Sequence, residues 1–195
     1  MADGKFNYSI FDQYVQLCME VGIDQNITIY TPIPWGNRFR YRDEKTGVDV
    51  YESWAPGTTE FKDHWNIFLT DLRKHLDERG WFAKTYLGIN ENAMEQTLAA
   101  IKVIKDHSKD WRITYAGDWY PQLDPLLDDY SFVHGKEPSM AEQKLRMTRG
   151  RTSTFYVCCT PARPKQFSFL AADRRTLVGL VCICLWLRWI SSLGL

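Results

Sequence analysis

Short apolar, strand-like runs alternate with helical patterns along most of this chain, and this alternation constrains its fold more than any other feature. The strand-like runs lie at 27–30, 83–89, 111–116, 130–133 and 154–158, and apolar residues recur at helical spacing over 10–21, 61–76, 92–107, near 121–128 and near 138–149. Near-continuous apolar strands separated by helices are typical of parallel sheets covered by helices. The sequence therefore predicts an α/β fold, either a (β/α) barrel or an open doubly wound sheet.

The loops after these strands favour the barrel. None of them carries a Gly-x-Gly-x-x-Gly or Walker-type motif, which is the main signal of a nucleotide-binding open sheet. We count five good strands and a candidate sixth near 181–187, whereas a full barrel needs eight strands and about 250 residues. We therefore expect a partial (β/α)8 TIM-type barrel, incomplete at the N-terminus and with an atypical C-terminus.

Composition limits the classes of partner. The 195 residues suffice for one core, and 24 basic residues balance 24 acidic ones, so no basic excess favours nucleic acid or an anionic membrane as a partner. The apolar tail at 177–187 is about half as long as the ~20 residues that span a bilayer. Residues 1–5 lack the apolar core of a signal peptide. We expect no nucleic-acid or membrane partner, and the sequence leaves the oligomeric state open.

Cysteine and histidine usage predicts no metal site. The five cysteines are odd in number and lack a disulfide-framework spacing, so buried free thiols are the favoured interpretation and a metal site is a weak alternative. His64 and His75 share a helix face but lie roughly 16 Å apart along it, too far to bind one ion.

The junction at residues 85–94 is the best candidate for a chemical site. The strand-like run 85–89 ends abruptly in Asn90-Glu91, and a helix pattern begins with Asn92, which forms a capping-box arrangement with Glu95. Glu91 is thereby placed at the C-terminal end of a strand, where parallel α/β folds carry their chemistry. The alternative is that Glu91 only complements the dipole of the following helix.

Other polar and aromatic residues follow strands at the same predicted edge. The long connection 30–60 contains a predicted hairpin, 38–41 with 48–51, and loop aromatics suit flat, partly apolar ligands such as sugar rings. Trp35 is the best candidate for ligand contact, although aromatics that fasten the hairpin explain this loop equally well. Asp118 and Trp119 follow the strand at 111–116, and Asp118 alternatively caps the next helix.

Residues 80–86, Gly-Trp-Phe-Ala-Lys-Thr-Tyr, followed by Asn90-Glu91, resemble the catalytic domain of glycoside hydrolase family 123, the β-N-acetylgalactosaminidases. In that family an adjacent Asp-Glu pair follows such a segment. The resemblance also covers 11–14, the strand to Tyr30 with Pro34-Trp35, and 151–159 with Pro161 and Pro164, and it fades after Phe169. It implies a partial catalytic barrel domain at 6–169, an atypical apolar tail at 170–195, and an exported or periplasmic parent protein.

The resemblance further implies a glycosidase that hydrolyses terminal β-linked N-acetylgalactosamine by a substrate-assisted retaining mechanism, without a cofactor or metal. Glu91 matches the general acid, and Asn90 occupies the stabiliser position, where it accepts the acetamide N–H but brings no charge. Activity is therefore expected to be reduced. The expected substrate-binding residues are Tyr30, Trp35, Tyr86, Asp118, Trp119, His134 and Tyr156. The alternatives are a non-catalytic carbohydrate-binding relative and an inactive barrel fragment.

Two features of the surroundings of Glu91 have opposite effects on its protonation in this interpretation. Burial among Tyr86, Trp119 or Trp35 favours the protonated acid that catalysis needs, whereas the helix that follows favours the ionised form. A working general acid therefore requires the effect of burial to be the larger one.

Overall fold

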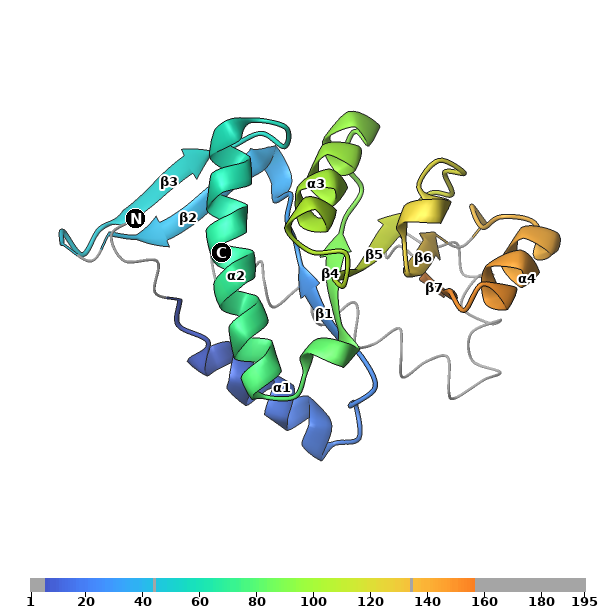
Figure 1. Cartoon of the computed structure of the whole chain (residues 1–195), viewed down its shortest axis with the longest axis horizontal. Helices are drawn as coiled ribbons and strands as arrows, with labels where there is room; N and C mark the ends of the chain where they lie inside the picture. Colours follow the sequence, from blue (N-terminus) through green and yellow to red (C-terminus); the bar gives the residue numbers. More distant parts are fainter. Residues whose placement is uncertain (1–5, 44, 134, 157–195) are drawn as a thin grey trace, which may run out of the picture. The chain divides into compact units, whose positions relative to one another are not determined.

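A computed structural model describes residues 6–43, 45–133 and 135–156 (Figure 1). Its described residues form two compact units: the first comprises residues up to 116 together with 120–129, and the second comprises 117–119 and the residues from 130 onward.

The first unit alternates helices with parallel strands. Its elements are α1 (Ser9–Glu20), β1 (Ile27–Tyr30), the 3-10 helix η1 (Trp35–Asn37), β2 (Arg38–Arg42), β3 (Asp49–Ser53), α2 (Thr59–Glu78), η2 (Phe82–Lys84), β4 (Thr85–Ile89), α3 (Met94–His107), β5 (Arg112–Gly117) and η3 (Asp124–Leu126). β1 pairs in parallel with β4, and β4 pairs in parallel with β5. The predicted α/β class is confirmed.

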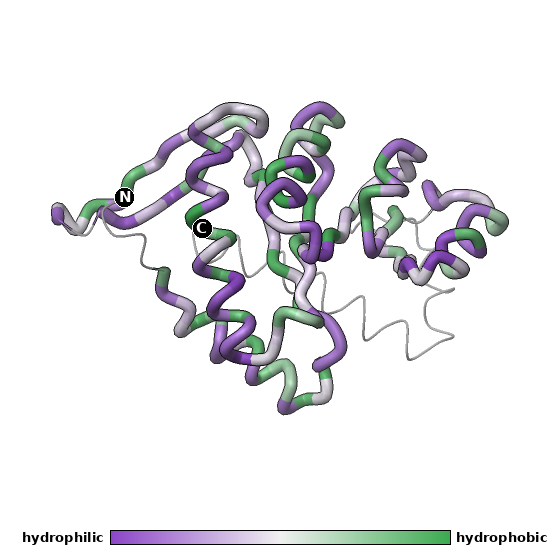
Figure 2. Tube along the Cα trace, in the orientation of Figure 1, coloured by the Kyte–Doolittle hydropathy of each residue, from purple (hydrophilic) through white to green (hydrophobic). Residues whose placement is uncertain are grey.

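The core of this unit lies where α2 and α3 pack against the parallel strands (Figure 1). The fully buried side chains come from one face of each helix and from alternate strand positions: Phe61, Leu69, Leu72 and Leu76 of α2, Ala100, Ile101 and Ile104 of α3, and Leu87, Ile89 and Ile113 of the strands. Figure 2 shows hydrophobic and hydrophilic residues interspersed along α2, as expected for a helix with one buried face. The predicted helical stripe at 61–76 thus forms the core of the unit.

The hairpin β2–β3 has the predicted position and is fastened to α2 by stacked rings. Trp54 stacks on Phe39 at 4.6 Å and on His64 at 3.8 Å between ring centroids. Glu52 accepts hydrogen bonds from the Tyr41 hydroxyl at 2.8 Å and from Trp54 Nε1 at 3.1 Å. For Tyr41 and Trp54 the structure therefore supports the alternative that loop aromatics hold the hairpin in place.

Polar contacts join helix α1 to α2. Asp12 contacts His75 Nε2 at 2.7 Å and Arg79 Nη2 at 2.5 Å, and the ring of Tyr8 stacks on His75. The predicted apolar stripe of this helix is largely exposed instead of buried. Its members Ile10, Leu17 and Val21 are 57–67% exposed. Cys18 is half-buried, and the other four cysteines lie outside the described residues.

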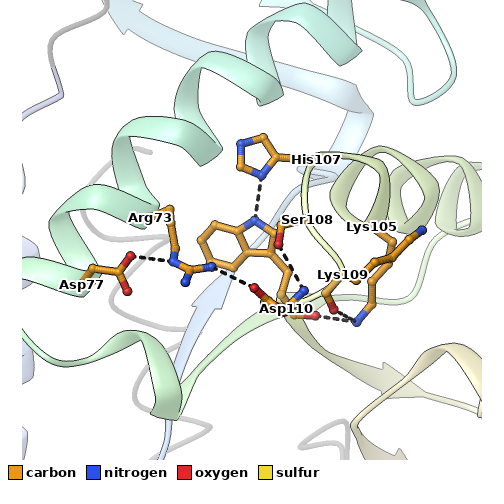
Figure 3. A network of polar contacts seen from close by, with 8 residues as sticks. Arg73, Asp77, Lys105, His107, Ser108, Lys109 and Asp110 are labelled. Atoms are coloured by element: carbon orange, nitrogen blue, oxygen red, sulfur yellow. Dashed lines mark hydrogen bonds and ion pairs between the residues drawn. The ribbon is translucent and has the colours of Figure 1, made fainter.

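A polar network ties α2 and α3 to the start of β5 (Figure 3). Arg73 pairs with Asp77 at 2.7 Å and Asp110 at 3.6 Å. Trp111 donates from Nε1 to His107 Nδ1 at 3.0 Å, and Lys105 donates from Nζ to the main-chain oxygen of Trp111. Lys105 thus anchors the segment that carries the fully buried Trp111.

His107 makes the stability of this junction dependent on pH. Its Nδ1 accepts from Trp111, and its Nε2 lies 3.0 Å from Thr70 Oγ1, so the neutral ring satisfies both contacts. Burial, and secondarily the charge of Arg73, lowers the pKa of His107 below its ordinary value of 6.5. Protonation in the unfolded chain is then easier than in the folded one, so stability is lost as the pH falls below about 6.5.

We expect the free energy of unfolding, measured by urea titration at pH 7 and pH 5, to fall more in the wild type than in His107→Gln. Glutamine retains an acceptor for Trp111 but does not titrate. Equal losses in both proteins would show that another group causes the pH dependence.

The second unit contains most of β6 (Asp129–Val133), α4 (Met140–Thr148) and β7 (Thr152–Tyr156), with β6 and β7 as neighbours in the sheet. Helix α4 begins with a complete capping box between Ser139 and Glu142. Arg146 is buried and donates to the Ser153 hydroxyl at 3.0 Å and to the main-chain oxygen of Thr152 at 2.9 Å. These bonds join α4 to β7.

Within the first unit β1, β4 and β5 follow one another in the sheet, and within the second unit β6 and β7 are neighbours. Closure into a barrel stays a prediction. The prediction of a helix near 121–128 was wrong in its extent, because only the 3-10 helix η3 (Asp124–Leu126) forms there. 3-10 helices rarely exceed three or four residues, because their hydrogen-bond geometry is poorer than that of an α-helix. The candidate sixth strand at 181–187 and the tail at 170–195 lie outside the described residues.

Candidate active site

The C-terminal ends of the parallel strands bring two polar segments of the first unit together. In the sheet register Tyr30 lies opposite Gly88, and Ile89 lies opposite Tyr115. Thr31 directly follows β1, and Asn90 directly follows β4. Because parallel strands point the same way, these segments meet at one edge of the sheet.

Asn90 is the centre of a hydrogen-bond network at this edge. Its Oδ1 accepts from the Thr31 hydroxyl at 2.8 Å and from Asn92 Nδ2 at 2.8 Å. Thr31 Oγ1 in turn accepts from the main-chain N–H of Ile33 at 3.3 Å. Asn92 Nδ2 also lies 3.4 Å from the main-chain oxygens of Ile33 and Asn90. The side chain of Asn90 is therefore held from two segments that are far apart in the sequence.

The predicted capping box between Asn92 and Glu95 was wrong. Helix α3 begins at Met94 with Ala93 as its N-cap, and no side chain caps it. The carboxamide of Asn92 instead turns back to Asn90. Asparagine side chains bond readily to local groups other than a helix N-terminus, and here the acceptor next to the strand end is the one satisfied.

Glu91 is exposed, whereas Asn90 and Asn92 beside it are half-buried. Burial of Glu91 among aromatic side chains, which a protonated acid would require, is not seen. The carboxylate stands at the strand end as predicted and is accessible to a ligand from solvent.

Tyr30 lies with its ring across β4. A Cβ built on Gly88 would approach Tyr30 Cε2 to 2.6 Å and Cδ2 to 2.7 Å, so only glycine leaves room for this ring. Burial, and secondarily the carboxylate of Asp129, raises the pKa of Tyr30. Asp129 also accepts from the Thr114 hydroxyl at 2.6 Å. Tyr30 is thus a neutral phenol, half-buried at the end of β1.

Two further predicted binding residues lie in the first unit. Trp35 follows β1 in η1 and is 71% exposed, and Gly36 after it takes a φ of +72° that favours glycine. Unlike Trp54, Trp35 does not fasten the hairpin through a stacked ring and is open to solvent. Tyr86 on β4 is half-buried, with the guanidinium of Arg112 5.6 Å from its ring centroid.

The other predicted binding residues belong to the second unit. Trp119 packs on Tyr130 at 5.3 Å and on Phe132 at 5.7 Å between centroids, and the main-chain oxygen of Asp118 accepts from the Tyr130 hydroxyl at 2.6 Å. The alternative role of Asp118 as a helix cap was wrong, because η3 begins later and has no side-chain cap. Tyr156, the last residue of β7, is half-buried.

His134 lies outside the described residues, so its predicted binding role stays a prediction.

Sequence reasoning missed Thr31 as a member of the site. It lies 59 residues before Asn90, and only the pairing of β1 with β4 brings the two side chains together. The available signal was its place directly after a strand, the criterion that selected Asn90 and Glu91.

Two features are absent from the described residues. No group of three or more metal-ligating side chains gathers in that part of the chain. Likewise, none of its helices combines the length and hydropathy that crossing a bilayer requires.

Parallel strands covered by helices, with polar side chains gathered where the strands end, define an α/β domain of the kind that carries enzyme sites. The family model of the glycoside hydrolase 123 catalytic domain matches residues 1–190. The chain therefore belongs to glycoside hydrolase family 123, as its sequence motifs predicted.

A solved structure gives the same relationship. The chain is 29% identical to a family 123 glycoside hydrolase from Clostridium perfringens that was analysed for glycolipid glycan hydrolysis, with a TM-score of 0.72. The match covers 82% of this chain and 30% of that enzyme, so the chain spans less than a third of its relative's length. A search of curated proteins finds no match.

Proposed function

We propose that this chain carries the catalytic residues of a glycosidase that acts on terminal β-linked N-acetylgalactosamine by a substrate-assisted retaining mechanism. The observation that carries the proposal is the Asn90-Glu91 pair at the C-terminal edge of parallel strands in a family 123 domain. The similarity to an enzyme analysed for glycolipid glycan hydrolysis supports a glycan substrate. As part of the proposal, residues 6–169 are assigned to a partial catalytic (β/α)8 barrel domain and 170–195 to an atypical apolar tail, and 157–195 lie outside the described residues.

In the proposed reaction the 2-acetamido oxygen of the sugar attacks its own anomeric carbon. The bond to the leaving oxygen breaks as Glu91 donates a proton to that oxygen. Water then opens the oxazolinium-like intermediate with Glu91, now ionised, as the base. The exposed carboxyl group of Glu91 is accessible to the glycosidic oxygen, and the bound sugar is proposed to supply the burial that favours the protonated acid.

Position 90 holds the acetamido group in this scheme. A carboxylate there would stabilise the positive charge that develops on the intermediate, whereas Asn90 brings no charge. Its Oδ1 is already bound by Thr31 and Asn92. We therefore propose that turnover is slow relative to an enzyme with aspartate at this position.

The sugar ring is proposed to stack on Trp35, whose exposed indole has the flat apolar face that sugars bind. Tyr30 and Tyr86 lie on the strands that lead to the site, and Asp118, Trp119, His134 and Tyr156 complete the proposed binding set. Of these residues, only Trp35, Tyr30 and Tyr86 belong to the unit that contains Glu91.

A non-catalytic carbohydrate-binding relative is the second candidate. The uncharged Asn90, with its carbonyl oxygen engaged by two donors, is the observation that favours it. Such a protein would retain the sugar site and lack measurable hydrolysis.

Glu91→Gln tests the proposed function. On an alkyl β-N-acetylgalactosaminide, whose leaving group needs a proton, we expect the hydrolysis rate to fall about 10²- to 10⁴-fold. The fall on a nitrophenyl substrate should be much smaller, because nitrophenolate leaves without protonation.

Glu95→Gln is the matched control. Glu95 is exposed in the first turn of α3, and its substitution removes the same charge. Equal rates for the wild type and Glu91→Gln on both substrates would contradict the role of Glu91. Binding of N-acetylgalactosamine without hydrolysis of either substrate would establish the second candidate.

A further inference from the structure

The hydrogen bonds around Asn90 fix which end of its carboxamide faces a ligand. We infer that Thr31 and Asn92 are positioning residues that hold Oδ1 of Asn90 within the protein and leave Nδ2 toward the sugar, so that position 90 acts as a hydrogen-bond donor. This inference rests on the proposed function, because it concerns the same sugar site.

The orientation of Asn92 follows from its neighbours. Its Nδ2 faces the main-chain oxygens of Ile33 and Asn90, both at 3.4 Å. Carbonyl oxygens only accept hydrogen bonds, so an oxygen of Asn92 in that place would meet two other acceptors. The amide nitrogen of Asn92 must therefore lie on this side.

The orientation of Asn90 follows in turn. The atom of Asn90 that faces Asn92 Nδ2 at 2.8 Å must be an acceptor, which is Oδ1. Thr31 fits this orientation, because its hydroxyl accepts from the N–H of Ile33 at 3.3 Å and donates its own hydrogen to Oδ1 at 2.8 Å. A hydroxyl can also accept two hydrogen bonds, so Asn92 selects the orientation of Asn90 and the bond from Thr31 strengthens it.

The other end of the carboxamide is directed elsewhere. Among the described residues Nδ2 of Asn90 makes no hydrogen bond, and the side chain is half-buried at the strand edge. Both acceptor directions of Oδ1 are used by Thr31 and Asn92. A ligand at this position therefore meets an N–H donor and not a carbonyl acceptor.

This polarity predicts which part of an acetamido group is recognised. The donor at position 90 pairs with the acetamide oxygen of the sugar, and the acetamide N–H of the sugar gains nothing from it. The expectation that Asn90 accepts the acetamide N–H is thereby replaced. An aspartate at the same place would present its second oxygen and reverse the preference.

A pair of sugars distinguishes the two polarities. N-acetylgalactosamine and its 2-acetonyl analogue share the carbonyl oxygen, but the analogue has CH₂ in place of N–H. By titration calorimetry we expect the wild type to bind both with affinities within about threefold. Asn90→Asp should favour N-acetylgalactosamine by about tenfold, because a charge-assisted bond to the N–H is worth about twice a neutral one.

Thr31→Val and Thr31→Ser test the positioning role. Valine removes the hydroxyl donor at nearly the same volume, whereas serine keeps it. We expect Thr31→Val to weaken binding of both sugars by about three- to tenfold and Thr31→Ser to restore wild-type affinity. A loss in both variants would indicate packing in place of positioning.

The side-chain amide signals in ¹⁵N NMR spectra report the orientation without any sugar. We expect slower hydrogen exchange at Asn92 Nδ2 than at Asn90 Nδ2, with the protection at Asn92 reduced in Thr31→Val. Slower exchange at Asn90, or a tenfold preference of the wild type for N-acetylgalactosamine over the analogue, would overturn the inference. Absence of binding to both sugars, with the expected exchange pattern, would refute the proposed sugar site and leave the orientation established.

Discussion

Asn90→Asp is expected to raise the rate of hydrolysis of an aryl β-N-acetylgalactosaminide by about 10²- to 10³-fold. The structure provides a frame for the carboxylate, because Thr31 and Asn92 already donate to the inner atom of this side chain. One oxygen of the aspartate would keep these two bonds, and the other would replace the amide nitrogen beside the ligand. Preorganised groups that stabilise developing charge are typically worth this much in rate.

Initial rates of wild type and variant at saturating substrate measure this effect. Asn26→Asp is the matched control, since Asn26 is exposed before β1 and gains the same charge outside the site. If Asn90→Asp were no faster than Asn26→Asp, charge at position 90 would not limit the reaction. Unchanged rates of Glu91→Gln on the alkyl substrate as well would exclude the pair as the catalytic centre.

The strands of the first unit were predictable because their signals are local. The run Ile27-Thr28-Ile29-Tyr30 is bounded by polar residues on its N-terminal side and by a proline shortly after it, and β1 has these bounds. The hairpin at 38–53 turns at Lys45-Thr46-Gly47, and Gly47 takes a φ of +67° there. In both cases residues within a few positions decide the conformation.

Predictions that depended on competition between partners were less successful. Asn92 with Glu95 has the spacing of a capping box, but the acceptors at Asn90 and Ile33 hold the carboxamide of Asn92 instead. Ser139 with Glu142 has the same spacing and does form the box, with the Ser139 hydroxyl accepting from the main-chain N–H of Glu142. The spacing is the same in both, but serine is a typical residue of the capping box, whereas the longer carboxamide of Asn92 reaches its tertiary neighbours.

In the candidate site, too, the local features were predictable and the tertiary contacts were not. Asn90 and Glu91 follow the end of a strand, so their position was expected from the local pattern and from family resemblance. The exposure of Glu91 and the bond from Thr31 to Asn90 depend on how segments 59 residues apart meet. No periodicity in the sequence encodes that contact.

Gly88→Ala is expected to lower the free energy of unfolding of the first unit by about 3 kcal/mol, because inserting a methyl group into a filled space costs about 1–3 kcal/mol or somewhat more. The added Cβ would lie 2.6–2.7 Å from two ring atoms of Tyr30 and 2.8 Å from Thr28 Cγ2. Gly88 does not have a positive φ, so the expected loss is purely steric. The Tyr30 ring would have to leave its place over β4.

Urea unfolding of Gly88→Ala, Tyr30→Leu and the double variant measures the steric coupling. Leucine lacks the ring atoms that the new Cβ would meet, so the double variant should lose less than the sum of the single losses. Gly80→Ala is the control, because Gly80 has a φ of +68° with no atom within 4 Å of its Cβ position. Additive losses, or a loss no larger than that of Gly80→Ala, would show that the Tyr30 ring does not occupy the space above Gly88.

The same variant connects packing with the site. Tyr30 is followed directly by Thr31, whose hydroxyl donates to Asn90. If the ring of Tyr30 is displaced, the segment after β1 moves with it, and the bond to Asn90 lengthens. We therefore expect Gly88→Ala to weaken binding of N-acetylgalactosamine about as much as Thr31→Val does, under conditions in which the variant is still folded. Unchanged affinity in a destabilised Gly88→Ala would show that the position of Thr31 does not depend on the packing beneath it.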